Sequence, residues 1–148
     1  MPEAPIVPVL SSSVAGPLGV KHLPRLWLKI LLHAVGRLPN GYRHGNGGFD
    51  EFLTTALGID NAAFVEYIET KRPDYLTLET WVRENATLLN EETIAAVNER
   101  VASANLPEQM LAERVAQLGI PDTTITEAVA LNNLDDWAAM HASLTKNF

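Results

Sequence analysis

The sequence of 148 residues fits one domain of ordinary size. It has no cysteine, which excludes disulfides, thiolate metal sites and thiol catalysis, and its net charge of −7 argues against duplex nucleic acid as a partner. No apolar stretch approaches the ~20 residues of a membrane span, and the first residues lack the pattern of a secretory signal. We therefore expect a soluble, cytoplasmic protein that binds neither nucleic acid nor a membrane.

The N-terminal part of the chain predicts an extended arm followed by a helix. Residues 1–20 contain four prolines, which remove backbone donors and fix φ, so this arm should be extended or disordered. A helix is predicted from about Pro24 to Leu38, since proline is favoured in a first turn and Pro39-Asn40-Gly41 stops the helix. This helix is apolar over most of its circumference, which is typical of a helix at the centre of a core.

The polar side of this helix is a basic band. Because its members are four residues apart and slightly overshoot one turn each time, the band should face water, a cleft or a partner. The members are Arg25, Lys29, His33 and Arg37. Residues 1–49 as a whole carry a net charge of +4 and residues 50–148 a net charge of −11. This asymmetry favours an anionic ligand or pairing between subunits; alternatively, the two parts neutralise each other within the fold.

Start and stop signals after a glycine-rich loop at 39–49 predict a series of further short helices. The expected starts are Asp50, Asp60, Leu78, Asn90, Pro107, Thr124, and Asn133 or Asp135. Gly58 and Gly119 are typical residues just after a helix end. We therefore predict an all-α fold, a compact array of about seven or eight short helices. Residues 1–20 would form the extended arm and residues 21–148 a single helical domain.

Several short segments resemble those of a known family. They are Pro17-Leu18-Gly19-Val20, Leu23-Pro24-Arg25, the following loop with glycines and a tyrosine, Phe52-Leu53, Leu57-Gly58-Ile59-Asp60, Trp81-Val82-Arg83-Glu84, Pro121-Asp122-Thr123-Thr124 and Asp136-Trp137. Over about residues 17–137 the chain is similar to a family of small uncharacterised bacterial proteins, catalogued as a domain of unknown function. The resemblance implies a helical single domain and a bacterial source, and it implies no particular reaction.

The glycine-rich loop and the residues that flank it form the first candidate site. Glycines before a helix N-terminus leave backbone N–H groups free for an anion, and Arg37 and Arg43 add guanidinium groups that match carboxylate or phosphate. His44 would transfer a proton near neutral pH, with Tyr42 as a further donor and Asp50 as the group that orients the histidine. Alternatively, the loop is simply solvated, its glycines make turns and Asp50 only caps a helix.

His33 is the second candidate, at the mouth of the same expected pocket. Buried beside cations, its imidazole would be neutral and able to accept a proton. Trp27 and Lys29 on the same helix would then contact the ligand. The alternative is a partly exposed histidine on the polar side of the helix, with Trp27 in the core.

The sequence predicts neither a metal nor a cofactor. It has no His-Glu-x-x-His motif and no tight cluster of histidine and carboxylate residues. Its serines lack the Gly-x-Ser-x-Gly setting of hydrolases, so a Ser/His/Asp mechanism is not expected.

Two classes of function remain. In the first, the protein binds an anionic or polar small molecule between the first helix and the glycine-rich loop. There it performs a cofactor-independent proton transfer such as isomerisation, elimination, decarboxylation or cyclisation. In the second, it is a non-catalytic interaction module or a homo-oligomer, such as a homodimer, whose interface is the apolar first helix and the N-terminal arm. We favour the first class, because positive charge, histidine and glycine are concentrated in one part of the chain.

Overall fold

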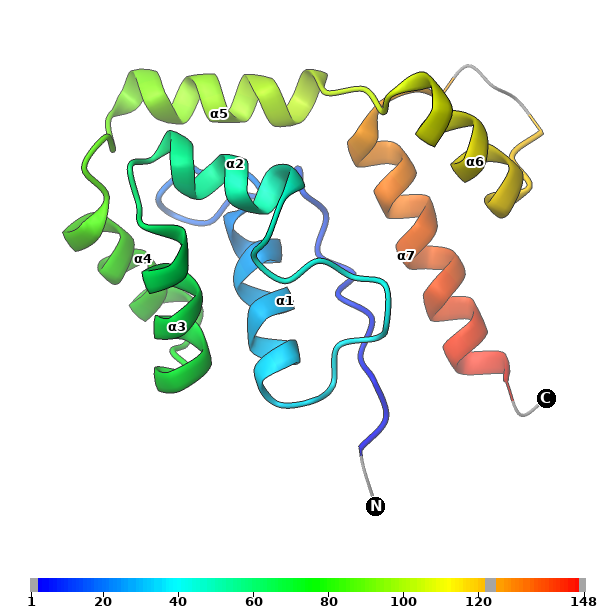
Figure 1. Ribbon diagram of the computed structural model, residues 1–148, viewed down its shortest axis with the longest axis horizontal. Helices are drawn as coiled ribbons and strands as arrows, with labels where there is room; N and C mark the ends of the chain where they lie inside the picture. Colours follow the sequence, from blue (N-terminus) through cyan, green and yellow to red (C-terminus); the bar gives the residue numbers. More distant parts are fainter. Residues whose placement is uncertain (1–2, 122–124, 147–148) are drawn as a thin grey trace.

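The computed structural model describes residues 3–121 and 125–146, and Figure 1 shows their arrangement. Seven α-helices and no β-strand occur in this part of the chain, so the predicted all-α fold is confirmed. The helices are α1 (Leu23–Ala34), α2 (Gly48–Ala56), α3 (Asn61–Lys71), α4 (Tyr75–Asn85), α5 (Glu91–Ser103), α6 (Glu108–Leu118) and α7 (Ala128–Thr145). None of these helices is both long enough and apolar enough to cross a membrane.

The central helix of the hydrophobic core is α1. Leu26 and Ile30 on this helix are 0% exposed, and α1 contacts both α3 and α4. Phe64 on α3 and Leu78 on α4 belong to the same buried cluster. Full burial of one such side chain contributes about 1.5–3 kcal/mol to folding. The apolar circumference of α1 is therefore covered by the chain's own core, as its sequence pattern predicts.

Several helix ends follow the capping residues predicted from the sequence. The side chains of Asp60 and Asn90 accept hydrogen bonds from the backbone N–H groups of Ala63 and Thr93, at 3.3 and 2.8 Å. Gly119 ends α6 in a left-handed conformation with φ of 67°. Local signals of this kind depend only on neighbours in the sequence, which is why they are read correctly.

Two helix boundaries near the glycine-rich loop differ from the prediction. Helix α1 ends at Ala34 rather than Leu38, because Gly36 adopts a φ of 73° and the chain turns there. Helix α2 begins at Gly48, so Asp50 lies in its first turn and does not cap it. The Asp50 side chain is consequently available for tertiary partners.

The other differences lie in α4 and α7. Helix α4 begins earlier than predicted, at Tyr75, because Asp74 caps it with its side chain. A single helix, α7, replaces the two expected near the C-terminus and continues through Asn133 and Asp135. Thr124, the expected start of the first of these two helices, lies outside the described residues.

The other helices lie on two sides of α1. In Figure 1, α3 and α4 lie on one side of α1, and the pair formed by α6 and α7 lies on the other side, reached through α5. The non-helical segment 3–20 and the loop at 35–47 run between α1 and α7. Val7, Ser12 and Val20 are 5%, 1% and 0% exposed. The extended N-terminal segment is thus packed into the molecule at the place where the two sides meet.

Candidate functional site

A pocket of about 450 Å³ lies between the α6–α7 pair and the opposite wall made by α1, α2 and the glycine-rich loop. On the α1 side it is lined by His22, Arg25 and Lys29. Arg100, near the C-terminal end of α5, and Arg114, on α6, line it from the other direction. Cationic side chains from three helices therefore face one cavity, although the protein as a whole is acidic.

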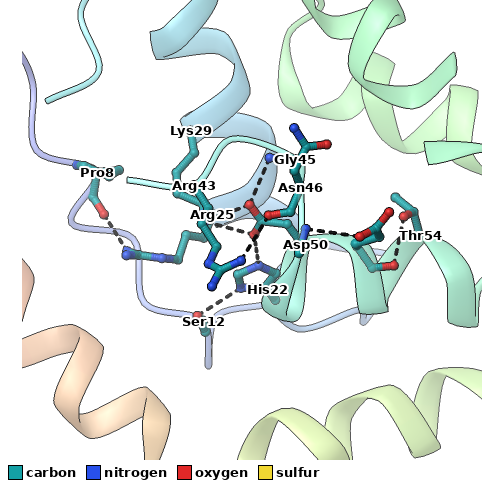
Figure 2. A network of polar contacts seen from close by, with 12 residues as sticks. Pro8, Ser12, His22, Arg25, Lys29, Arg43, Gly45, Asn46, Asp50 and Thr54 are labelled. Carbon is teal, nitrogen blue, oxygen red and sulfur yellow. Dashed lines mark hydrogen bonds and ion pairs between the residues drawn. The ribbon is translucent and has the colours of Figure 1, made fainter. Parts of the chain in front are cut away.

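Asp50 is the centre of a buried polar network at this pocket (Figure 2). Its carboxylate accepts hydrogen bonds from His22 Nε2 at 2.7 Å, from Lys29 Nζ at 2.9 and 3.0 Å, and from the N–H of Gly45 at 3.0 Å. Asp50, His22 and Lys29 are 1%, 2% and 6% exposed. A carboxylate offers about four acceptor sites, so these bonds occupy it. Asp50 therefore joins α1, α2 and the loop, and it orients its neighbours.

Burial and hydrogen bonding determine the protonation of this network. Burial alone would raise the pKa of Asp50, but the hydrogen bond from His22 and the charge of Lys29 outweigh it and lower that pKa to about 2. Burial lowers the pKa of Lys29, and the nearby Asp50 opposes this effect. Burial also lowers the pKa of His22 by more than the hydrogen bond to Asp50 raises it. At neutral pH the network is an aspartate–lysine ion pair beside a neutral imidazole.

His22 is held in an unusual backbone conformation directly before α1. Its φ is 74°, in the left-handed region that residues other than glycine rarely adopt. The ring is fixed on both sides, since Nε2 donates to Asp50 and Nδ1 lies 2.9 Å from Ser12 Oγ. Such strain costs about 1–3 kcal/mol and persists only where the surroundings enforce it. The polar network therefore keeps a histidine where glycine would be unstrained.

Ser12, His22 and Asp50 are connected in the order of a hydrolase triad, but they lack the access that a triad requires. Ser12 is 1% exposed and is not among the residues that line the pocket. A nucleophilic hydroxyl has to reach the substrate. The arrangement is best explained as support for the His22 ring, in agreement with the sequence, which lacks a nucleophile motif.

A second buried network attaches α7 to α1. Arg25 forms two hydrogen bonds with Asp136, at 2.6 and 3.2 Å, and also donates to the backbone oxygens of Pro8 and Leu10. The hydroxyl of Tyr42 donates to Asp136 at 2.9 Å. Burial, and then this hydrogen bond, raise the pKa of Tyr42, so its hydroxyl stays protonated. Arg25 and Tyr42 consequently line the pocket in fixed positions.

Arg43 and Arg100 line the pocket and have no carboxylate partner among the described residues. Arg43 Nη1 makes a long contact of 3.4 Å with the backbone oxygen of Asn46. The guanidinium carbon of Arg100 lies 5.6 Å from the centre of the Phe52 ring, in a cation–π geometry. Both residues are exposed and line the pocket, and a guanidinium group is suited to bind an anion.

The glycine-rich loop brings the start of α2 to the same pocket. Gly47 and Gly48 have φ of 69° and 56°, and a Cβ on Gly47 would collide with the guanidinium of Arg43. Helix α2 has no side-chain cap, and Gly48 and Phe49 line the pocket. Because the first N–H groups of a helix carry partial positive charge, this end of α2 adds to the positive potential of the pocket.

Four of the residues predicted from the sequence come together in the pocket. Lys29, Tyr42, Arg43 and Asp50 all line it. Asp50 is hydrogen-bonded to a histidine, but that histidine is His22 and neither of the two predicted candidates.

The two predicted histidines do not line the pocket. His33 and His44 contact each other, with ring centres 3.7 Å apart, and His33 Nδ1 lies 4.0 Å from a carboxylate oxygen of Glu69. Burial, and then the neighbouring His33, lower the pKa of His44. Within residues 3–121 and 125–146, no group of three histidine, aspartate or glutamate side chains is placed to hold a metal ion.

Arg37 and Trp27 also have other positions than predicted. Arg37 binds the N-terminal segment, donating to the backbone oxygen of Ala4 at 3.0 Å and pairing with Glu3 at 3.1 Å. Trp27 packs against the hydrophobic core and donates its Nε1 proton to the backbone oxygen of Pro73 at 2.9 Å. Neither side chain lines the pocket.

Several residues of the pocket and its buried networks are absent from the sequence candidates. They are His22, Arg25, Arg100, Arg114 and Asp136. Arg25 and Lys29 lie one turn apart in the basic band. This spacing is the sequence signal that could predict that both line the same wall of the pocket. Asp136 is 111 residues from Arg25, so no local spacing indicates that the two meet.

The fold and the site define an all-helical domain with a cationic pocket between a central helix and a peripheral helix pair. The chain belongs to the family described as Domain of unknown function (DUF5069), whose model matches residues 9–138. The resemblance to an uncharacterised family is thereby confirmed. No curated protein matches the chain. The family description specifies no ligand or reaction.

Proposed function

We propose that this protein binds an anionic small molecule, a metabolite of the cytoplasm, in the pocket between the α6–α7 pair and α1. One observation carries the proposal. Of the eleven lysines and arginines in the chain, five line this one pocket: Arg25, Lys29, Arg43, Arg100 and Arg114. The carboxylates that line it among the described residues are Asp50 and Asp135. A cavity with one sign of charge raises the local concentration of the opposite ion.

The internal ion pairs support this proposal, because they leave part of the positive charge unneutralised. Lys29 is matched by Asp50, and Arg25 is matched by Asp136. Within residues 3–121 and 125–146, Arg43 and Arg100 are the pocket arginines without a carboxylate partner, and they are left for a ligand. Lys29 also has donor capacity beyond its two contacts with Asp50, because an ammonium group carries three protons.

The size and lining of the pocket favour an organic ligand over a simple ion. A volume of about 450 Å³ is within the range of small-molecule sites. Phe49, Phe52 and Met110 also line it and offer apolar surface to the body of such a molecule. An anionic group near the arginines and an apolar part against these side chains would together fill the cavity.

A proton-transfer reaction at this site would depend on Lys29 and Tyr42. Both ring nitrogens of His22 are engaged, by Ser12 and Asp50, so this imidazole is a weak candidate for a general base. Burial lowers the pKa of Lys29, which brings an amine closer to the range of acid–base catalysis. Tyr42 keeps its proton and serves as a donor.

Thermal denaturation in the presence of small anions tests the proposal. The probes are acetate, citrate, benzoate and phenyl phosphate, with benzyl alcohol and glucose as neutral controls. A bound anion stabilises the protein by about 2.7 kcal/mol at about 100 times its Kd, so Tm should rise with anions and stay constant with neutral probes. The rise should be lost in Arg43→Gln/Arg100→Gln and kept in Arg83→Gln, an exposed arginine on α4 outside the pocket. No response to any anion, or an equal response in the double variant, would contradict the proposal.

A further inference from the structure

The charges around the pocket specify more than the sign of the ligand. Lys29, Arg25 and Arg114 each have a carboxylate partner, with Arg114 Nη1 lying 3.5 Å from Asp135. Arg43 and Arg100 have none in the part of the chain that the structure describes. Two unneutralised guanidinium groups at one cavity leave a surplus of two positive charges. A dianion compensates this surplus, whereas a monocarboxylate leaves half of it.

The two guanidinium groups also approach the cavity from different elements. Arg43 lies on the glycine-rich loop, where Gly47 leaves room for its guanidinium. Arg100 lies on α5 above the ring of Phe52. A carboxylate has two coplanar oxygens that one guanidinium fork can engage. A phosphate monoester has three terminal oxygens pointing in different directions, which suits two donors from separate walls together with Lys29.

We propose that the ligand is a phosphate monoester carried on a small apolar or aromatic body, with its phosphate between Arg43 and Arg100. This inference rests on the proposed function, because it names the class of anion for the same pocket. The apolar side chains of Phe49, Phe52 and Met110 receive the organic part. Gly48, in the first turn of α2, also lines the pocket and can add a backbone N–H on the phosphate side, whereas the N–H of Gly47 is donated to Glu51.

Calorimetric titration with phenyl phosphate and phenyl sulfate tests the charge requirement. The two probes have nearly the same shape, but phenyl phosphate is largely a dianion near pH 7.5 and phenyl sulfate is a monoanion. Phenyl phosphate should bind at least about 10-fold more tightly than phenyl sulfate or benzoate. It should also bind at least about 10-fold more tightly than inorganic phosphate, which has no apolar body to bury.

Variants of the two arginines test the position of the phosphate. Arg43→Gln and Arg100→Gln should each weaken phenyl phosphate binding by about 10-fold or more and reduce its advantage over phenyl sulfate. Arg83→Gln is the matched control and should leave both affinities unchanged. Circular dichroism melts of each variant verify that the fold is retained, and both arginines are exposed enough for substitution to leave the core intact.

The outcomes separate the two proposals. Equal affinity for phenyl phosphate, phenyl sulfate and benzoate would overturn the phosphate assignment and leave an anion site. Phenyl phosphate binding that is unaffected by both arginine substitutions would overturn the assigned position. If inorganic phosphate bound as tightly as phenyl phosphate, the claim that the ligand carries an apolar body would be overturned. Absence of binding by every anion would overturn the proposed function itself.

Discussion

His22 and Asp50, 28 residues apart in the sequence, share a hydrogen bond of 2.7 Å between the ring Nε2 and the carboxylate Oδ1. This bond connects the residue before α1 to the first turn of α2. Lys29 reaches the same carboxylate from the second turn of α1. These three residues therefore fix how α1 and α2 meet at the pocket. A substitution of any of them should change both the free energy of unfolding and ligand binding.

The positive φ of His22 leads to an unusual order of stabilities. His22→Ala loses both ring hydrogen bonds and keeps the strained backbone, whereas His22→Gly loses the same bonds and relieves the strain. A left-handed residue other than glycine costs about 1–2 kcal/mol, so the glycine variant should be more stable than the alanine variant by about 1 kcal/mol. Urea denaturation of both variants measures the difference. A more stable alanine variant would show that residue 22 does not keep this conformation.

The ion pair between Lys29 and Asp50 should behave as a buried pair. Asp50→Asn leaves the ammonium of Lys29 buried without a counter-charge and should cost about 3–5 kcal/mol of unfolding free energy. Adding Lys29→Met to this variant removes the unmatched charge and should recover part of the loss. The double-mutant cycle is measured by chemical denaturation. Simple additivity of the two single effects would contradict the pairing.

The buried imidazole of His22 predicts that acid destabilises the protein. Its pKa is lowered below 6.5 in the folded state, so the unfolded chain binds more protons as the pH falls through 6.5. The stabilising contribution is present above pH 6.5 and is lost as the pH decreases towards the folded pKa. Unfolding free energies at pH 7.5 and 5.5 should differ less in His22→Gln than in the wild type. His141→Gln, at an exposed position, is the control and should retain the full pH dependence.

The contact between Arg25 and Asp136 predicts that this buried pair contributes strongly to the attachment of α7 to α1. Asp136→Asn should cost about 3–5 kcal/mol, because Arg25 is only 5% exposed and loses its counter-charge. Hydrogen exchange should then increase in α6 and α7 more than in α1. The neighbouring Asp135→Asn is the control, since its side chain is 48% exposed and its pair with Arg114 is worth less than about 1 kcal/mol. Equal effects of the two substitutions would contradict this attachment.

The sequence indicates the fold better than the site, for a physical reason. Caps such as Asp60 and Asn90 accept hydrogen bonds from N–H groups three residues away, so their role can be predicted from the local sequence. The role of Asp50 depends on tertiary partners instead, and the capping rule wrongly predicts that it is the N-cap of α2. His33 and His44 do meet, as their positions on α1 and the loop suggest. They meet outside the pocket that Tyr42 lines, and spacing along the sequence does not specify this difference.

The most direct measurement is an NMR titration of the ¹⁵N-labelled protein with phenyl phosphate and, separately, with benzoate. An anion bound in the pocket should produce saturable shifts of backbone amides around it, largest at Gly48, Phe49 and Arg100, and these shifts should be lost in Arg43→Gln/Arg100→Gln. Shifts confined to α3 and α4, or the absence of any saturable change with either anion, would contradict an anion site between the α6–α7 pair and α1.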